Sequence, residues 1–327
     1  MDDIRWGIIG CGDVTEVKSG PAFNKIENSS LVAVMRRNGE LAKDYAARHG
    51  VPKWYDQAED LIHDSDVNVI YIATPPSSHK TYTIEAAKAG KPVYVEKPMA
   101  MNEDECREMI DVCNEAGVPL YVAFYRRALP RFLKVKELIE QGAIGDVRFV
   151  SIQQTQQLME KDENGEWPWR VRPDVSGGGI FYDVASHTLD LMDYLLGPVQ
   201  EVKGFAANQQ QAYPAEDIVS GSFRFENGII GSGMWSFAAY KNEEKNRIVG
   251  SEGEITFSCF EEKPVTLKTA EGSRQFIIEH PKHIQECLIQ SVVEELLGKG
   301  EAPSTGESAL RTNRVMDELL QAYYQHS

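Results

Sequence analysis

The sequence has no long apolar run, no excess of positive charge and no paired cysteine motif. Without a stretch of about eighteen consecutive apolar residues, we expect no transmembrane helix and no membrane partner. The first six residues lack the basic region and the apolar stretch of a signal peptide, so we expect none. Fifty acidic residues against 34 basic ones give a formal net charge of −16. That balance argues against nucleic-acid binding, which needs a basic face.

Cysteine usage favours a reducing compartment. The cysteines are scattered, odd in number and never spaced as CxxC: Cys11, Cys106, Cys113, Cys259 and Cys287. We therefore expect free thiols in a cytoplasmic protein. Cys106 and Cys113 could share one helix face, but two sulfurs without a nearby histidine make a poor zinc site. We predict no metal.

The first 120 residues alternate between short apolar runs and helical patterns. Such runs are typical of strands buried on both faces of a parallel sheet. The expected strands cover residues 4–9, 31–35, 67–73, 92–95 and 120–124, and the expected helices cover 40–50, 79–90 and 102–117. This alternation predicts a doubly wound α/β domain.

From residue 146 onward, the pattern changes to strands joined by turns. Asn227-Gly228 between two apolar segments is a strong hairpin signal. Strands are expected at 147–158, 200–211, 218–226, 229–238, 254–260, 264–269 and 274–279, and helices at 130–141, 180–196, 283–297 and 306–325. The second half is therefore predicted to be an α+β domain with a mostly antiparallel sheet.

A glycine loop, GIIGCGDVT at residues 7–15, lies between an expected strand and an expected helix. Gly10 allows a tight turn, and Gly12 lets backbone N–H groups approach a pyrophosphate at the positive end of the helix. Thr15 replaces the third glycine of the GxGxxG pattern, and the glycines could instead serve only as turn formers. The context favours a dinucleotide site whose residues are Gly10, Cys11, Gly12, Asp13 and Val14.

Two arginines, Arg36 and Arg37, follow the second expected strand, about twenty residues past the glycine loop. An NAD-binding domain usually carries Asp or Glu there for the ribose 2′-hydroxyl. Two guanidiniums suit a 2′-phosphate, because arginine pairs bidentately with phosphate. We favour NADP(H), while NAD(H) stays open because one of the two could be an ordinary surface arginine.

Two further clusters carry chemistry. Glu96-Lys97-Pro98 ends an expected buried strand, and ligands of doubly wound sheets bind outside the carboxyl ends of strands. Asp183, His187 and Asp190 follow three consecutive glycines, and on a helix their spacing places them on one face.

These elements together resemble the Gfo/Idh/MocA oxidoreductases, the relatives of glucose–fructose oxidoreductase and inositol dehydrogenase. The resemblance covers nearly the whole chain, and Thr15 is the main departure. It implies a dinucleotide-binding Rossmann domain over residues 1–123. A substrate-binding and oligomerisation domain would cover 124–327, with the last helix a candidate to return to the first domain. The matching elements are the loop at 7–12, Thr74-Pro75 through His79, Ala89-Gly90-Lys91 leading into Glu96-Lys97-Pro98, Tyr125-Arg126-Arg127, Trp169-Arg170, the helix with Asp183 and His187, and the stretch from His283 through Tyr324.

The resemblance implies hydride transfer between a nicotinamide and a carbon that bears a hydroxyl or carbonyl group. Lys97 would hydrogen-bond the reacting oxygen and stabilise its developing negative charge. His187 would be the general acid/base, since the unperturbed pKa of a histidine lies near neutrality. Asp183 would orient the substrate or support this pair, and Glu96 would hold the cofactor or the lysine. The other implied contacts are those of Thr74, Pro75, His79, Lys97, Trp169 and Arg170 with the cofactor, and of Tyr125 and Arg126 with the substrate.

Each assignment has a purely structural alternative. Lys97 could be a solvated lysine, His187 a hydrogen-bonded core histidine, and Asp183 a helix-start residue favoured by the helix dipole. Asp190 could be the partner of His187. Further alternatives are a helix cap for His79, a loop filler for Cys11, and packing against the second domain for Tyr125, Arg126, Trp169 and Arg170.

We expect an NADP(H)-dependent dehydrogenase or reductase that acts on a sugar, a polyol or a related cyclic compound. One alternative is a nucleotide-sensing regulator without chemistry, which the joint presence of Lys97, Asp183 and His187 argues against. Another is a glycosidase that retains NAD, which Arg36 and Arg37 fit poorly. We also expect a homo-oligomer, a dimer or tetramer, through the free face of the antiparallel sheet.

Overall fold

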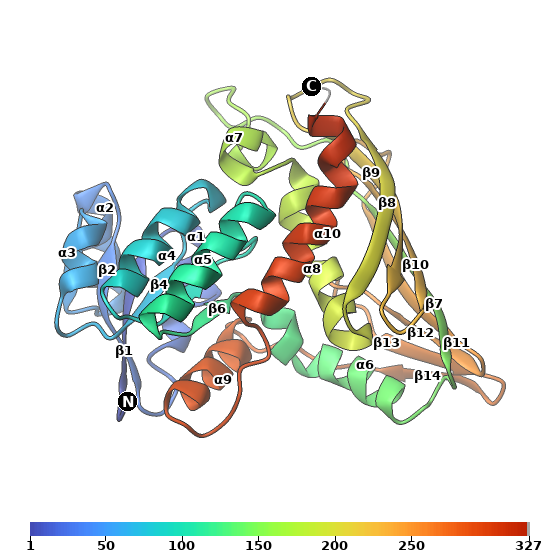
Figure 1. Cartoon of the computed structure of the whole chain (residues 1–327), viewed down its shortest axis with the longest axis horizontal. Helices are drawn as coiled ribbons and strands as arrows, with labels where there is room; N and C mark the ends of the chain where they lie inside the picture. The colour runs from blue at the N-terminus through green and yellow to red at the C-terminus, as the bar shows by residue number, and fades with distance from the viewer. Residues whose placement is uncertain (326–327) are drawn as a thin grey trace. The chain divides into compact units, whose positions relative to one another are not determined.

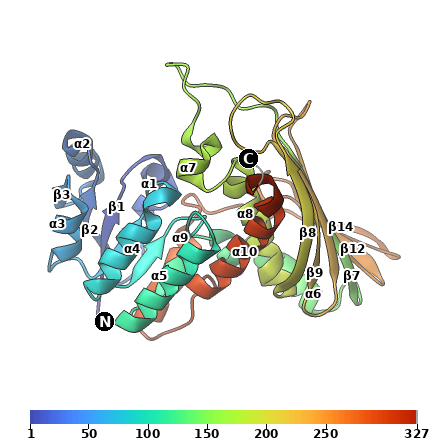
Figure 2. The same cartoon turned by 45° about the horizontal axis from the view of Figure 1, so that its top comes forward.

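The computed structural model describes residues 1–325, and the chain divides into two compact units whose elements are labelled in Figures 1 and 2. The first unit contains Met1–Leu129 and Pro281–Leu310, and the second contains Pro130–His280 and the residues from Arg311 onward. The segment that returns to the first unit is therefore Pro281–Leu310, whereas the last helix continues into the second unit. Within residues 1–325, no helix is both long and apolar enough to cross a membrane.

The first unit is built on a six-stranded sheet in the order β3-β2-β1-β4-β5-β6. All neighbouring strands are parallel. The chain starts in the middle of the sheet at β1, moves outward through β2 and β3, and returns to β4 on the other side of β1. This reversal makes the sheet doubly wound, as predicted. The strands are β1 Ile4–Ile9, β2 Ser29–Met35, β3 Lys53–Tyr55, β4 Val69–Ile72, β5 Val93–Val95 and β6 Leu120–Val122.

Helices connect these strands, and local signals set their ends. The side chain of Asn102 accepts a hydrogen bond from the backbone N–H of Glu105 at the start of α5, and Gly117 ends that helix in the left-handed conformation. The first unit contains α1 Asp13–Val17, α2 Gly39–His49, α3 Ala58–His63, α4 His79–Lys88, α5 Glu103–Ala116 and α9 Glu286–Leu296. Its 3-10 helices are η1 Gly20–Ala22, η2 Pro76–Ser78 and η3 Tyr125–Ala128.

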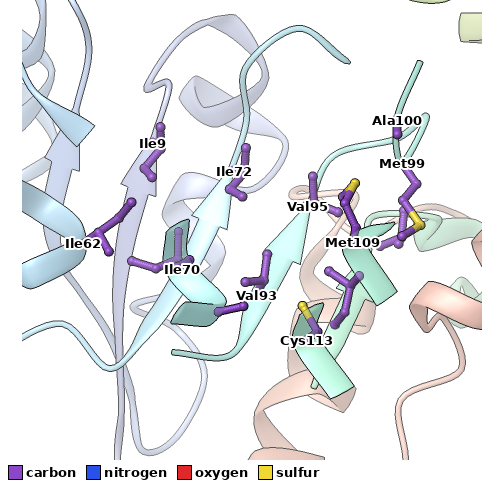
Figure 3. Packing of buried hydrophobic residues seen from close by; sticks show 14 of the residues in the cluster. Ile9, Ile62, Ile70, Ile72, Val93, Val95, Met99, Ala100, Met109 and Cys113 are labelled. Atoms are coloured by element: carbon purple, nitrogen blue, oxygen red, sulfur yellow. The ribbon is translucent and has the colours of Figure 1, made fainter. Parts of the chain in front are cut away.

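The two faces of the parallel sheet differ in composition because side chains alternate along each strand. One face is aliphatic: Figure 3 shows Ile72, Val93 and Val95 beside Met109 and Cys113 of α5. The opposite face is aromatic, with Trp6, Tyr71, Tyr94 and Tyr121 almost fully buried. The phenol groups on this face require buried hydrogen-bond partners, which position the site described below.

The second unit contains an eight-stranded sheet in the order β14-β13-β12-β11-β7-β10-β9-β8. The pair β7–β10 is parallel and the other neighbours are antiparallel, which confirms the predicted mostly antiparallel sheet. The strands are β7 Val147–Thr155, β8 Val199–Ala207, β9 Ile218–Phe225, β10 Ile230–Ser236, β11 Glu243–Gly250, β12 Gly253–Phe257, β13 Val265–Thr269 and β14 Gly272–Phe276.

Helices cover the inner face of this sheet. Phe181 of α8 meets Trp235 of β10 with ring centroids 5.2 Å apart. Gly204 and Gly221 lie opposite each other on β8 and β9, and a Cβ on either would come within 2.5 Å of the Leu319 side chain. These glycines therefore allow α10 to lie close to the sheet. The second unit contains α6 Pro130–Glu140, η4 Trp169–Val171, α7 Pro173–Ser176, α8 Ile180–Leu196 and most of α10 Gly306–Tyr324.

Candidate active site

The glycine loop follows β1 and has the geometry of a phosphate cradle. Gly10 has φ +93°, and a Cβ there would lie 2.7 Å from the Thr74 side chain. Its N–H and that of Cys11 both donate to the carbonyl of Met35. A Cβ on Gly12 would meet nothing closer than 3.9 Å, so the loop leaves room at the start of α1. Among residues 1–325, no protein atom accepts from the amides of Gly12, Asp13 or Val14. This arrangement fits a dinucleotide pyrophosphate.

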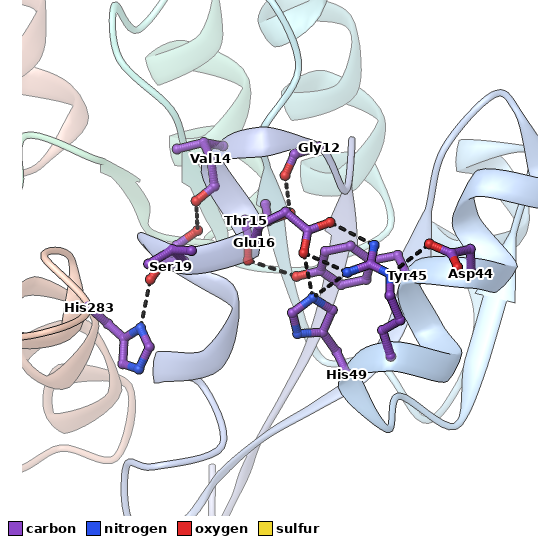
Figure 4. A network of polar contacts seen from close by, with 11 residues as sticks. Gly12, Val14, Thr15, Glu16, Ser19, Asp44, Tyr45, His49 and His283 are labelled. Carbon is purple, nitrogen blue, oxygen red and sulfur yellow. Dashed lines mark hydrogen bonds and ion pairs between the residues drawn. The ribbon is translucent and has the colours of Figure 1, made fainter.

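Thr15 fits the loop despite the departure from GxGxxG. Its side chain is fully buried, and its hydroxyl donates to the carbonyl of Gly12 at 2.7 Å. The Tyr45 hydroxyl of α2 donates to the carbonyl of Thr15 at 2.8 Å (Figure 4). Thr15 thus tightens the first turn of α1 and fastens it to α2.

Glu16 fastens α1 to α2 a second time. Arg48 donates two hydrogen bonds to its carboxylate, at 2.7 and 2.8 Å, and His49 lies 2.8 Å away. The hydrogen bonds from Arg48 lower the pKa of Glu16 to about 2. On the other side, the His283 ring contacts the carbonyl of Val17 at 2.6 Å. His283, the first residue of the C-terminal stretch that resembles the family, therefore holds the end of α1.

Arg36 and Arg37 are both exposed at the end of β2. Neither guanidinium makes a hydrogen bond or an ion pair with another residue of the described chain. The first carboxylate that follows them in the sequence is that of Glu40.

Cys11 of the glycine loop is buried, and burial raises its thiol pKa to about 11. A protonated thiol in this loop acts as a small apolar filler.

His79 connects two loops at the carboxyl edge of the sheet. Its ring is fully buried, with Nε2 2.7 Å from the carbonyl of Thr74 and Nδ1 3.0 Å from that of Pro98. Burial lowers its pKa. This burial argues against the predicted direct contact of His79 with the cofactor and against a simple helix cap. Thr74 and Pro75, in contrast, are partly exposed.

Lys97 is half-buried directly after β5, and the neighbouring Glu96 is tied into the aromatic face. The Glu96 carboxylate accepts hydrogen bonds from the Tyr71 hydroxyl and the Gln285 amide, both at 2.6 Å. The Gln285 carbonyl oxygen in turn accepts from Tyr94 at 3.0 Å. Glu96 therefore holds the strand end that carries Lys97.

The residues expected near the nicotinamide or the substrate form a chain of contacts within the second unit. Arg170 stacks over the Trp169 ring, with 4.6 Å from its guanidinium carbon to the ring centroid. Its Nε also donates to Asp183 at 2.8 Å. Arg170, predicted to contact the cofactor, is thus paired with Asp183, predicted to contact the substrate.

The first unit holds two other residues predicted to contact the substrate. The Arg126 guanidinium carbon lies 4.9 Å from the centroid of the Tyr125 ring, and both residues are mostly buried.

His187 follows Asp183 by one turn of α8 and is 5% exposed. Its ring meets that of Phe260 nearly edge-on, with centroids 5.7 Å apart. Asp190, one turn further along, is fully buried. The helix therefore has the predicted face of Asp183, His187 and Asp190, with exposure decreasing along it.

Comparison with known proteins identifies the family. A family model described as "Oxidoreductase family, NAD-binding Rossmann fold" matches residues 4–124, and one described as "GFO/IDH/MocA C-terminal domain" matches residues 132–256. Oxidoreductase P35 from Formosa agariphila is 42% identical over 318 residues, which cover 96% of this chain and 97% of that protein. The chain belongs to the Gfo/Idh/MocA oxidoreductase family.

Other relatives of this Gfo/Idh/MocA oxidoreductase are named for sugar substrates. The 1,5-anhydro-D-fructose reductase of Ensifer adhaerens is 28% identical and covers 94% of this chain and 92% of its own length. A solved levoglucosan dehydrogenase, in complex with NADH and levoglucosan, has a TM-score of 0.88 at 24% identity over 99% and 98% of the two chains. That likeness shows the fold. The predicted family, fold class, oxidoreductase class and nicotinamide cofactor are confirmed.

The predicted site residues of this oxidoreductase fall into both units. The first unit holds Gly10, Cys11, Gly12, Asp13, Val14, Arg36, Arg37, Thr74, Pro75, His79, Glu96, Lys97, Tyr125 and Arg126, and the second holds Trp169, Arg170, Asp183 and His187. Their individual roles stay predictions. Within the described residues, no group of three or more His, Cys, Asp or Glu side chains could hold a metal ion.

Sequence reasoning missed a buried carboxylate at the start of α8. Glu216 is fully buried, and its carboxylate accepts hydrogen bonds from the N–H of Gly179 at 2.8 Å and from the Tyr324 hydroxyl at 2.6 Å. Burial raises its pKa to about 7. A Cβ on Gly179 would lie 2.6 Å from the Glu216 carbonyl, which explains why glycine precedes this helix. No motif marks Glu216, because its partners lie far from it in sequence.

Proposed function

We propose that this oxidoreductase transfers a hydride between NADP(H) and the hydroxyl-bearing or carbonyl carbon of a sugar, a polyol or a related cyclic compound. The observation that carries the proposal is the pair of reactive side chains on supported elements. Lys97 lies at the end of β5 beside the anchored Glu96, and His187 lies on α8 one turn after Asp183. The names of relatives such as 1,5-anhydro-D-fructose reductase support a sugar-like substrate.

The proposed chemistry divides between the two residues. A nicotinamide bound at the glycine loop would supply the hydride acceptor for oxidation of the substrate's carbinol carbon, and the hydride donor for the reverse reaction. Lys97 donates a hydrogen bond to the substrate oxygen, and His187 takes the hydroxyl proton as the C–O bond becomes a carbonyl. Arg170 holds the Asp183 carboxylate at 2.8 Å, so Asp183 offers a fixed acceptor to a second substrate hydroxyl.

The preference for NADP(H) rests on Arg36 and Arg37. Both are exposed at the end of β2, and their guanidiniums have no protein acceptor among residues 1–325. A 2′-phosphate would supply acceptors for them, whereas a ribose hydroxyl would leave both charges without a counter-ion. The rival function as an NAD-retaining glycosidase fits this pair poorly. A regulator without chemistry would have no use for Lys97 and His187 together.

The proposal is tested by tryptophan fluorescence titration with NADPH and, separately, NADH. The wild type is compared with the double variant Arg36→Ala/Arg37→Ala and with Arg148→Ala, an exposed arginine on β7, as the control. We expect NADPH to bind more tightly than NADH. The double variant should lose roughly 10- to 100-fold in NADPH affinity, as one or two charge-assisted hydrogen bonds would give, and little for NADH.

Equal binding of both nucleotides, or tighter binding of NADH, would overturn the assignment of Arg36 and Arg37. Failure to bind either would overturn the dehydrogenase itself, unless denatured protein releases a resident nucleotide. A resident NAD that does not turn over with sugars would favour the glycosidase. Turnover is assayed with NADP+ and with NAD+ against cyclic and open-chain polyols.

We also propose a homo-oligomer, a dimer or tetramer, formed through the outer face of the second unit's sheet. This face exposes large apolar side chains, which are uncommon on a monomer surface when they cluster. Phe149 and Ile230 are paired in register on β7 and β10, and Met234 lies on the same face of β10. A monodisperse monomer in light scattering at micromolar concentration would contradict this. Within the described residues, none of the five cysteines forms a disulfide. We propose a cytoplasmic location, where thiols stay reduced.

A further inference from the structure

An exposed aromatic side chain lies against the imidazole of α8. Phe260 is 41% exposed, whereas His187, whose ring it meets at 5.7 Å, is 5% exposed. Phe260 comes from the connection after β12, far from His187 in sequence. A partly exposed phenyl ring has only part of its burial free energy to hold it in place, so its position beside the imidazole has its cause in the backbone that carries it.

The cause is a loop, residues 258–261, that is fastened at its start by one buried carboxylate. Glu244 of β11 accepts hydrogen bonds from the backbone N–H of Cys259 at 2.7 Å and of Phe260 at 3.0 Å. It also accepts from the Ser258 hydroxyl and, at 2.8 Å, from the Asn246 amide. Four donors therefore converge on one carboxylate that is almost fully buried. Such a charge is retained where several hydrogen bonds compensate for its lost hydration.

The end of the loop is fastened as well. The guanidinium of Arg131, a buried residue of α6, donates to the carbonyl of Glu261 at 2.8 Å. The N–H of Glu261 donates to the Ser258 hydroxyl at 2.8 Å, which closes the turn on itself. Hydrogen bonds at both ends therefore restrain the backbone that carries the Phe260 ring, which lowers the entropy cost of binding a ligand against it.

We propose that Phe260 is a specificity-determining residue that selects cyclic over open-chain substrates, and that Glu244 is the positioning residue that holds it beside His187. The inference rests on the proposed function, in which His187 takes the substrate proton. A molecule that brings a hydroxyl group to this imidazole from the side of Phe260 must lie against the phenyl ring.

The apolar ring decides between the two substrate classes. A pyranose or cyclohexane ring presents a flat face of C–H bonds, which suits an aromatic wall. An open-chain polyol carries a hydroxyl group on each carbon and loses rotational freedom when it is fixed against a wall. An aromatic contact of this kind contributes about 0.5–1.5 kcal/mol, which corresponds to about 2- to 10-fold in affinity.

The test measures kcat and KM, at saturating nucleotide, for 1,5-anhydro-D-glucitol and for D-glucitol, two compounds that differ by ring closure. The wild type should prefer the cyclic compound. Phe260→Ala should raise KM for the cyclic compound by about 2- to 10-fold and leave KM for the open-chain compound nearly unchanged. Phe260→Leu keeps apolar bulk without the flat ring, so its KM for the cyclic compound should lie between those of the wild type and of Phe260→Ala. Leu133→Ala removes an apolar side chain of similar exposure from α6. It should leave unchanged the ratio of kcat/KM for the cyclic compound to kcat/KM for the open-chain compound, called the cyclic-to-open ratio below.

Glu244→Gln tests the positioning role. The carboxylate accepts from N–H and O–H donors on both of its oxygens, whereas glutamine replaces one oxygen by an NH2 group that cannot accept. It should shift the cyclic-to-open ratio in the same direction as Phe260→Ala. The matched control is Glu243→Gln, its neighbour on β11, which pairs with Lys241 at the surface. Glu244→Asp, which keeps the charge, should restore part of the ratio.

An unchanged ratio in both Phe260 variants would overturn the inference, as would a wild type that turns over the open-chain compound as well as the cyclic one or turns over neither. A ratio that changes equally in Glu243→Gln and Glu244→Gln would overturn the positioning role. His187→Gln separates the two levels. Full activity of that variant contradicts the proposed function, whereas its inactivity with an unchanged Phe260 ratio contradicts the inference alone.

Discussion

Two glutamates, one in each unit, hold the start of a functional helix and do so by opposite physics. Glu16 lies in α1, directly after the glycine loop, and is half-exposed beside the Arg48 guanidinium. Glu216 is fully buried at the start of α8 and accepts from the Gly179 amide and the Tyr324 hydroxyl. The pKa of Glu16 falls to about 2, and the pKa of Glu216 rises to about 7.

The difference shows which contribution dominates in each place. Near the surface, the hydrogen bonds from the Arg48 guanidinium outweigh desolvation and lower the pKa of Glu16. In the interior, desolvation outweighs the two neutral hydrogen bonds that reach Glu216. Because the two pKa values move in opposite directions, pH should act on the stability contributions of these two glutamates in opposite senses.

The largest expected effect is on Glu216. Its folded pKa lies above the unfolded value, so the native state binds more protons between about pH 4.5 and 7, and stability falls as pH rises through that window. A shift of this size corresponds to roughly 3 kcal/mol at about 1.4 kcal/mol per pKa unit. Glu216→Gln keeps an oxygen for Gly179 and an amino group for Tyr324, and removes the charge. It should abolish this fall, as measured by urea unfolding at pH 5 and pH 8.

The matched variant Tyr324→Phe separates charge from hydrogen bonding. It removes the 2.6 Å hydrogen bond to Glu216 and leaves the carboxyl group in place, so the fall in stability with pH should persist. If Glu216→Gln shows the same dependence on pH as the wild type, burial of this carboxylate does not control the start of α8.

A smaller effect of opposite sign is expected at Glu16. Its folded pKa lies below the unfolded value, so its contribution is present above about pH 4.5 and is lost as pH falls toward 2. Glu16→Gln should lower the thermal midpoint slightly at pH 7, because exposed pairs contribute little, and the difference should disappear at low pH. High salt should also shrink it. A deficit that persists in acid would mean that Glu16 acts through packing and not through charge.

The sequence predicted the fold where local signals suffice. Apolar runs located β1, β4 and β5, and the Asn102 cap and Gly117 delimited α5. The glycine loop, Lys97 and the helix of His187 were found because each follows a motif next to a predictable element. Each of these motifs is a local feature of about a dozen consecutive residues or fewer.

The parts that were missed depend on long-range partners. The central strand β11, Glu243–Gly250, is absent from the predicted strands. Its first residues are charged or polar, and two of its inward side chains are Glu244 and Asn246. Three of the four donors to Glu244 come from residues 258–260, and the Asn246 amide donates to Glu244 and to the Cys259 sulfur. No spacing rule connects residues 258–260 with these two side chains. Glu216 was missed for the same reason. The short elements β3 and α3 were also missed. The β3 sequence Lys-Trp-Tyr, with Trp54 exposed, is not an apolar run like those of β5 and β6, and α3 is only six residues long.

The proposed function requires that Lys97 and His187 act on one substrate oxygen. Single-turnover hydride transfer, measured with nucleotide saturating, tests it in the wild type, Lys97→Met, His187→Gln and the double variant. Each single variant should lose about 10²- to 10³-fold, and the double variant should lose little more than the slower single one, because residues that act together are not additive. Losses that multiply, or a single variant that keeps the wild-type rate, would contradict the account.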